Sequence, residues 1–197
     1  MPASGRPGRP GPQGPQGPQG PSPRTWGWHR LDDEWAARIV AAAEVRPGEL
    51  VLDIGAGTGA LTSHLVRAGA RVVAVELHPG RAGLLRQRFP GITVVEADAR
   101  DIPLPGSTFR VVASPPYGIT ADLLRLLLNA GPRLAAADLI LQRAAVRKYS
   151  SQRAPRTHRL TAGLTVPRRA FRPPPHVDSA VLLIRKRENA RNARNAR

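Results

Sequence analysis

The chain has 197 residues, and at 41% hydrophobic it is long enough to bury the core of one ordinary domain. It contains no cysteine and no histidines at metal-ligand spacing, which excludes disulfides and cysteine-ligated metals, and no metal is expected. Thirty Lys and Arg against 14 Asp and Glu give a net charge of +16, which favours a nucleic-acid partner.

The two ends of the chain have low-complexity sequences. Residues 1–24 contain "GPQGPQGPQGP", a run too short for a collagen triple helix, and are predicted to form a disordered lead. Residues 188–197 repeat Asn-Ala-Arg and are predicted to be a disordered basic tail. A single domain is therefore expected over residues 25–187. Because no segment has the length of a membrane span or the apolar core of a signal peptide, the protein is expected to be soluble and cytoplasmic.

Short apolar runs typical of strands alternate with helical patterns through the middle of the chain. Strands are predicted at 49–55, 71–77, 92–98, 109–114 and 137–142, helices at 60–69, 80–89 and 120–128, and a closing pair of strands at 159–171 and 179–187. Near-continuous apolar strands separated by helices predict an α/β fold with a Rossmann-like, doubly wound and mostly parallel sheet. Such a sheet binds ligands at the carboxyl ends of its strands.

A glycine-rich corner follows the first predicted strand in "DIGAGTGAL". Gly55 and Gly57 permit a tight turn and a close approach of a ligand to the backbone. The corner alone is ambiguous, because Gly55, Gly57 and Ala60 also satisfy the dinucleotide pattern G-x-G-x-x-G/A. Glu76 ends the second strand, where a carboxylate can bind ribose hydroxyls, and both kinds of nucleotide cofactor contain that ribose.

The stretch "SPPYG" ends the fourth strand, on the same edge as Asp98 at the end of the third. Hydride transfer has no need of this stiff corner, whereas methyl transfer to an exocyclic amine does. Ser114 Oγ and the Pro115 carbonyl can accept the amino hydrogens and stabilise the charge that develops on nitrogen. The Tyr117 ring can stack on an extruded base, with its hydroxyl dispensable. The corner therefore predicts an amino methyltransferase.

A stretch without acidic residues lies between Asp138 and Asp178. Its basic side chains predict contacts with RNA phosphates, because guanidinium forks match phosphate oxygens. These residues are Arg143, Arg147, Lys148, Arg153, Arg156, Arg159, Arg168, Arg169 and Arg172.

From about residue 26 to 187 the chain resembles the Erm family of rRNA adenine N6-methyltransferases, which is related to the KsgA/Dim1 dimethyltransferases, and especially its short mycobacterial-type members. The motifs are "VLDIGAGTGALT", "VVAVEL", "VVEADA", "VVASPPYGI", "LILQRAAVRKY" and "FRPPPHVDSAVLLI". The resemblance implies a class I methyltransferase that uses S-adenosylmethionine. It further implies a monomer that modifies an adenine in the peptidyl-transferase region of 23S rRNA, or of a large-subunit assembly intermediate. Resistance to macrolides, lincosamides and streptogramin B would result.

The resemblance also implies roles for single residues. It places Gly55 and Gly57 at the methionine part of the donor, Glu76 at the ribose, and Asp98, with Ala99 beside it, at the adenine amine. Alignment of "WGWHRL" with the usual Gln-Asn-Phe-Leu adds His29 and Leu31 at the methionine end. The implied catalytic residues are Ser114, Pro115, Tyr117 and Phe171, and Ser114 also contacts the donor.

Two departures from the family pattern keep alternatives open. The family corner usually begins with Asn, and Ser versions in other amino methyltransferases act on cytosine N4, so an enzyme acting on cytosine N4 or DNA adenine is one alternative. A non-catalytic RNA-binding assembly factor is another. The resemblance also leads us to expect that this chain lacks the helical C-terminal domain of longer relatives, and we therefore expect the sheet edge and the arginine stretch to hold the RNA.

Overall fold

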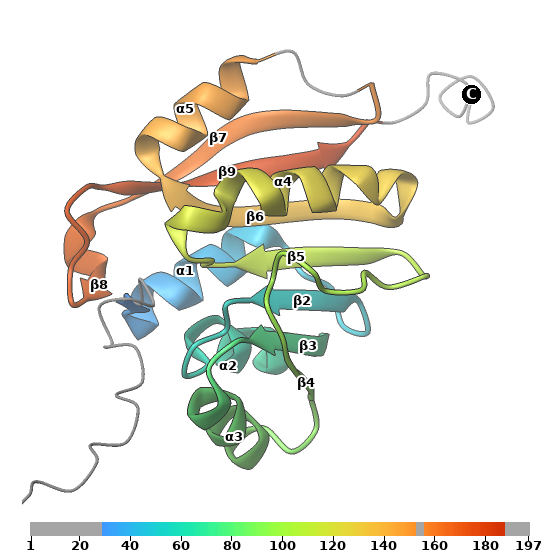
Figure 1. Ribbon diagram of the computed structural model, residues 1–197, viewed down its shortest axis with the longest axis vertical. Coiled ribbons are helices and arrows are strands. Elements are labelled where there is room, and N and C mark those ends of the chain that lie inside the picture. Colours follow the sequence, from blue (N-terminus) through green and yellow to red (C-terminus); the bar gives the residue numbers. More distant parts are fainter. Residues whose placement is uncertain (1–28, 153–155, 188–197) are drawn as a thin grey trace, which may run out of the picture.

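A seven-stranded sheet forms the centre of the protein (Figure 1). The computed structural model describes residues 29–152 and 156–187. The predicted lead, the predicted tail and Arg153 lie outside these described residues. In spatial order the strands are β4 (Thr93–Glu96), β3 (Arg71–Glu76), β2 (Leu50–Ile54), β5 (Phe109–Ala113), β6 (Leu134–Gln142), β9 (Ser179–Lys186) and β7 (His158–Val166).

The first five strands in this order are parallel, and β9 runs antiparallel to both of its neighbours. The two central strands β5 and β6 are buried along nearly their whole length, which explains why they read as continuous apolar runs. The predicted doubly wound, mostly parallel sheet is confirmed. The closing pair is present as β7 and β9, but β7 ends at Val166 rather than at residue 171, because Pro167 and a short helical turn at Arg168–Ala170 follow it.

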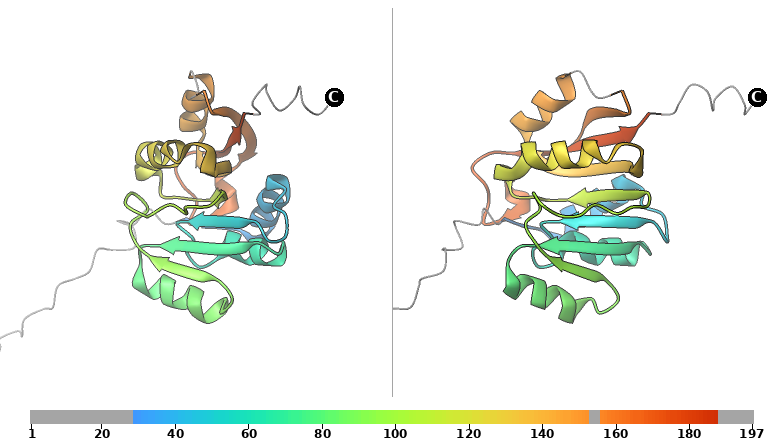
Figure 2. Two further views of the ribbon diagram at one scale, coloured as in Figure 1. Left: turned by 90° about the vertical axis from the view of Figure 1, so that its right-hand side faces the viewer. Right: turned by 45° about the vertical axis from the view of Figure 1, so that its right-hand side comes forward.

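Helices cover both faces of the sheet (Figure 2). The helices are α1 (Asp33–Ala43), α2 (Ala60–Arg67), α3 (Pro79–Arg88), α4 (Thr120–Asn129) and α5 (Arg143–Ser151). One apolar cluster joins α1 and α2 to one face, and α3 packs on the same face against Ala74. A second cluster joins α4 and α5 to the other face, where Ile102 from the β4–β5 connection also packs. None of the helices in the described ranges is long and apolar enough to cross a membrane.

Three elements were not predicted from the sequence. Helix α1 buries Ala36, Ile39, Val40 and Ala43, which follow the spacing of one helix face. Helix α5 follows β6 directly and buries only Val146. A two-stranded sheet pairs β1 (Arg30–Leu31) with β8 (Phe171–Arg172), so two segments far apart in the chain lie side by side.

The strand directions define two opposite edges of the sheet. The carboxyl ends of β2, β3, β5 and β6 lie at one edge, at the left of Figure 1, which we call the carboxyl edge. Because β9 is antiparallel to β6, it begins at this edge, where Ser179 pairs with Gln142. Strand β7 ends there for the same reason, with Val166 opposite Ser179.

Candidate active site

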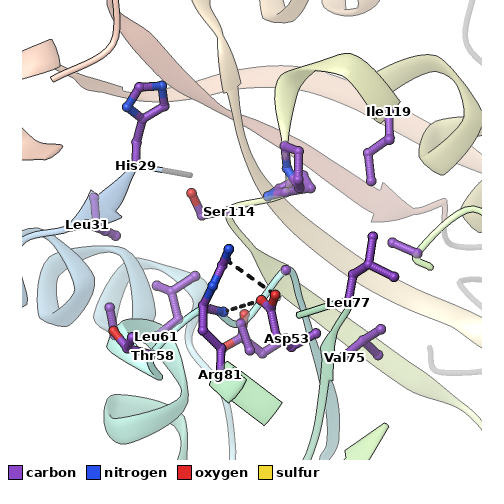
Figure 3. A pocket seen from close by; sticks show the side chains of 18 of the residues that line it. His29, Leu31, Asp53, Thr58, Leu61, Val75, Leu77, Arg81, Ser114 and Ile119 are labelled. Atoms are coloured by element: carbon purple, nitrogen blue, oxygen red, sulfur yellow. Dashed lines mark hydrogen bonds and ion pairs between the residues drawn. The ribbon is translucent and has the colours of Figure 1, made fainter. Parts of the chain in front are cut away.

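A cavity of about 220 Å³ opens at the carboxyl edge (Figure 3). In this view Ser114 lies between His29 and Ile119 on one side and Arg81 and Asp53 on the other. Every residue that the sequence analysis assigned to the donor or to catalysis lines this one cavity. They are His29, Leu31, Gly55, Gly57, Glu76, Asp98, Ala99, Ser114, Pro115, Tyr117 and Phe171.

The glycine corner touches the proline corner. Gly55 has φ +75°, and a Cβ built on it would lie 3.2 Å from Pro115 Cα and 3.3 Å from Pro116 Cδ. Only a residue without a side chain fits both this φ and this contact. The ends of β2 and β5 are therefore in direct contact, and the two halves of the cavity share a wall.

Glu76, the last residue of β3, is 5% exposed, and two backbone N–H groups donate to its carboxylate. Gly57 N donates to its Oε2 at 2.8 Å, and His78 N donates to its Oε1 at 2.9 Å. Arg81 Nη1 lies 3.3 Å from Oε1. Since a carboxylate oxygen can accept two hydrogen bonds, Oε2 retains capacity for a ligand hydroxyl.

Asp98 shares its carboxylate with Arg100. The backbone N–H and the guanidinium of Arg100 both donate to it, and these contacts hold the pKa of Asp98 below its usual range. A ligand amine at Asp98 would have to share or replace contacts with Arg100.

Asp53 is a cavity residue that the sequence analysis did not assign. It is 1% exposed on β2, and Thr62 Oγ1 donates to its Oδ2 at 2.7 Å. Its Oδ1 is buried without a hydrogen-bond partner among the described residues. Burial raises its pKa to about 7, and the nearby charge of Glu76 adds to the rise. The signal in the sequence is an acidic residue inside an apolar strand, two positions before Gly55.

The Tyr117 side chain is fixed on both sides. Its hydroxyl lies 2.7 Å from Oγ of Ser179, which is fully buried at the start of β9. Its ring is stacked near the His29 ring, with centroids 6.2 Å apart, and His29 Nδ1 is 2.8 Å from the Pro173 carbonyl oxygen. Burial raises the pKa of Tyr117, so its phenol stays neutral near pH 7. The sequence analysis missed Ser179.

Ser114 and Phe171 both line the cavity, but they differ in burial and in their contacts. Ser114 follows the last residue of β5, lines the cavity and makes no hydrogen bond through Oγ to another described residue. That hydroxyl is available to a ligand. Phe171 is 2% exposed and packs in the α1–α2 cluster, so it bounds the cavity from within the core.

The fold separates the predicted RNA-contacting residues into groups. Arg143, Arg147 and Arg168 line a second hollow at the carboxyl edge, and Arg169 and Arg172 follow Arg168 in the segment that ends with β8. Arg159 pairs with Arg185 near the opposite edge, and Arg156 precedes it there. Lys148 lies on α5, with its ammonium 5.5 Å from the Tyr149 ring centroid. The continuous arginine stretch of the sequence is therefore not one surface.

Comparisons with known proteins point to one family. The model of the family described as "Ribosomal RNA adenine dimethylase" matches residues 29–195. An rRNA methyltransferase of Streptomyces thermotolerans is 39% identical over 170 residues, which cover 80% of this chain and 56% of the relative. Ribosomal RNA small subunit methyltransferase A of Thermosynechococcus vestitus is 39% identical over 168 residues, 76% of this chain and 63% of the relative. The chain thus spans about three fifths of the length of these relatives.

Solved structures agree with these sequence matches. The crystal structure of the 23S rRNA methyltransferase ErmE matches with a TM-score of 0.73 and 33% identity, over 84% of this chain and 75% of that one. A dimethyladenosine transferase from Plasmodium falciparum shares the fold, with a TM-score of 0.72 and 24% identity over 81% of this chain and 64% of the other.

Proposed function

The chain belongs to the ribosomal RNA adenine dimethylase family, and on that premise we propose that it transfers a methyl group from S-adenosylmethionine to the exocyclic N6 of an adenine in the peptidyl-transferase region of 23S rRNA. Resistance to macrolides, lincosamides and streptogramin B is the proposed result. One observation supports this most: a single cavity joins the glycine corner to the Ser-Pro-Pro-Tyr corner.

The donor half of the cavity fits S-adenosylmethionine, the methyl donor of the family. The buried Oδ1 of Asp53, which has no hydrogen-bond partner among the described residues, suits a ligand that carries positive charge. Glu76 Oε2 would accept a ribose hydroxyl, and Asp98 would accept the adenine amine. Gly55 and Gly57 line the cavity, and the methionine part would lie against their backbone. When bound, the donor supplies an electrophilic methyl group on a sulfonium.

The acceptor half of the cavity is suited to an extruded adenine. The Ser114 Oγ and the Pro115 carbonyl would accept the two amino hydrogens, which localises the nitrogen lone pair and stabilises positive charge on nitrogen during attack. The Tyr117 ring would hold the base plane. Its neutral phenol, already bonded to Ser179, is not available as a proton acceptor.

The large ribosomal subunit is the proposed source of the adenine, supported by the 33% identity and TM-score of 0.73 with the 23S rRNA methyltransferase ErmE. A second candidate is an adenine of small-subunit rRNA. It is favoured by the 39% identity with the small subunit methyltransferase of T. vestitus.

Mass mapping tests the proposal. The purified protein is incubated with labelled S-adenosylmethionine and with 23S and 16S rRNA separately, and the modified base is located by nuclease mapping. We expect N6-methylated adenine in 23S rRNA. Label in 16S rRNA would favour the second candidate, and methylated cytosine or no transfer would overturn both. Macrolide susceptibility of cells with and without the gene, and with a Ser114→Ala variant, tests the proposed resistance.

A further inference from the structure

A second hollow of about 660 Å³ lies at the carboxyl edge, outside the donor cavity. We call it the basic hollow, and its walls come from the junction of β6 with α5, from the segment at Arg168, and from the loop before β9. Its charged and titratable residues are Arg143, Arg147, Arg168, His176 and Asp178.

The walls of the basic hollow are tied together by Asp178. Its backbone oxygen accepts a hydrogen bond from Arg143 N at 3.0 Å, and its carboxylate accepts one from Arg168 N at 2.8 Å. Three segments that are separate in the chain thereby keep a common arrangement. Asp178 therefore fixes the positions of the two backbone segments that carry the three arginines.

The charges of the basic hollow are not balanced within the described part of the protein. The guanidinium groups of Arg143, Arg147 and Arg168 make no hydrogen bond or ion pair with another described residue. Asp178 is the one acid of the hollow, and its carboxylate already accepts a backbone N–H. Three guanidinium forks around one hollow have the chemistry that binds a phosphate group.

The basic hollow adjoins the acceptor half of the active site. Asp178 directly precedes Ser179, which contacts the Tyr117 hydroxyl, and Gln142 of the hollow pairs with Ser179 across β6 and β9. A base that enters the cavity stays attached to its strand, and the strand must therefore pass over this part of the edge.

We propose that the basic hollow binds a backbone phosphate of the RNA strand that delivers the target adenine. This inference rests on the proposed function and goes beyond it, because it assigns three arginines to one phosphate site beside the target nucleotide. A phosphate contact at this point positions the strand without reading its sequence. Arg156 and Arg159, near the opposite edge, have no part in it.

The first test compares pairs of Arg→Gln substitutions, each of which removes two charges. The probe is a transcript of the peptidyl-transferase region of 23S rRNA, and its affinity is measured by fluorescence anisotropy from low to high KCl. For R143Q/R168Q we expect affinity to fall about tenfold or more, and the salt slope to fall by about 0.7 to 0.9 for one lost phosphate. R156Q/R159Q tests the opposite edge, and R67Q/R71Q is the control for net charge. A larger loss of slope in either of these pairs would overturn the proposal.

The second test identifies the phosphate. RNA oligonucleotides that contain the target adenine carry one neutral methylphosphonate at a time in place of a phosphodiester. We expect one linkage beside the adenine to weaken binding to the parent protein and to have no further effect on R143Q/R168Q. If every linkage affects the two proteins equally, the hollow binds no RNA phosphate and serves another anionic partner.

The outcomes separate this inference from the proposed function. Binding of S-adenosylmethionine, measured by calorimetry, shows that the variant is folded. If the parent protein methylates 23S rRNA and R143Q/R168Q has the same salt slope as the parent, only the phosphate site in the basic hollow is rejected. If R143Q/R168Q lowers the salt slope but the parent transfers no methyl group, only the proposed reaction is rejected.

Discussion

The hydroxyl of Tyr117 shows how one residue can have two separable functions. From the sequence, the ring is predicted to stack on the base and the hydroxyl to be dispensable. In the structure the hydroxyl is bonded to the buried Ser179 Oγ, which joins the proline corner to β9. The hydroxyl therefore orients the ring, for which we propose the contact with the base.

This division of tasks predicts a graded series at Tyr117. Tyr117→Phe keeps the ring and loses one neutral hydrogen bond, so we expect a loss of about 0.5 to 1.5 kcal/mol in single-turnover methyl transfer. Tyr117→Ala also loses stacking and is expected to cost about 1 to 3 kcal/mol more. Ser179→Ala should resemble Tyr117→Phe, and the double variant should be no worse than either single one. A Phe variant as impaired as the Ala variant would show that the hydroxyl takes part in the chemistry.

Glu76 accepts a hydrogen bond from the glycine corner and is the proposed acceptor for the donor ribose. Glu76→Ala should weaken binding of S-adenosylmethionine by about 1.5 to 3 kcal/mol, because charge-assisted hydrogen bonds to the ribose are lost. Titration calorimetry measures this effect, and RNA affinity in the same variant is the control. If variant and parent bind the donor equally well, Glu76 does not contact the donor and only accepts hydrogen bonds from Gly57 N and His78 N.

The raised pKa of Asp53 predicts a pH dependence of stability. In the unfolded chain its pKa is near 3.8, and in the fold it is about 7. Between these values the folded state holds a proton that the unfolded state has lost, so Asp53 makes stability fall as pH rises, by about 1.4 kcal/mol per unit. Above pH 7 its contribution is constant. Denaturant unfolding at pH 5, 6, 7 and 8 should show a weaker decline for Asp53→Asn than for the parent, whereas parallel curves would mean that Asp53 is ionised throughout.

At the scale of elements, two short strands outside the central sheet position some of the residues that line the cavity. The pairing of β1 with β8 brings His29 and Phe171 to the cavity, although they are far apart in the chain. The two-residue length of each strand gives almost no periodic signal, so sequence patterns alone could not locate them. The contact between the ends of β2 and β5 is similarly local in space and distant in sequence.

That contact predicts a difference between two glycines with similar backbone angles. Gly55→Ala brings Cβ against the Pro115 backbone, whereas a Cβ added to Gly48, at φ +81°, would meet no atom within 4 Å. Gly48→Ala should therefore cost only the strain of the left-handed conformation, about 1 to 2 kcal/mol of unfolding free energy. Gly55→Ala should cost more and also slow methyl transfer, because the proline corner must move. If the two variants have equal unfolding free energies and Gly55→Ala transfers methyl groups at the normal rate, the proline corner can move without affecting stability or activity.

At the scale of the whole molecule, the proposed donor site and the proposed phosphate site differ in burial. Asp53 and Glu76 of the cavity are buried, while the arginines of the basic hollow are exposed. Burial protects electrostatic interactions from salt, and exposure does not.

Salt should therefore separate the two binding events. Raising KCl is expected to weaken binding of the 23S transcript along a log-linear slope, because each phosphate contact releases counterions, and to leave the affinity for S-adenosylmethionine nearly constant. Anisotropy and calorimetry on one preparation give both values. A parallel loss of donor affinity would contradict this separation.

The sequence by itself determined the alternation of strands and helices and part of the lining of the donor cavity. Apolar runs and glycine corners are local signals, and the carboxyl ends of parallel strands necessarily meet at one edge, so Gly55, Glu76, Asp98 and Ser114 could be placed together without coordinates. Helix α1 could also be predicted from the sequence, since its buried positions follow helical spacing.

Only the tertiary structure decided which basic residues lie beside the active site and what the buried polar groups contact. The antiparallel direction of β9 brings Ser179 to Tyr117 and places the start of β7, with Arg159, near the far edge. The unpartnered oxygen of Asp53 depends on what α2 and β3 place around it. These features arise from contacts between segments far apart in the chain, which residue spacing does not encode.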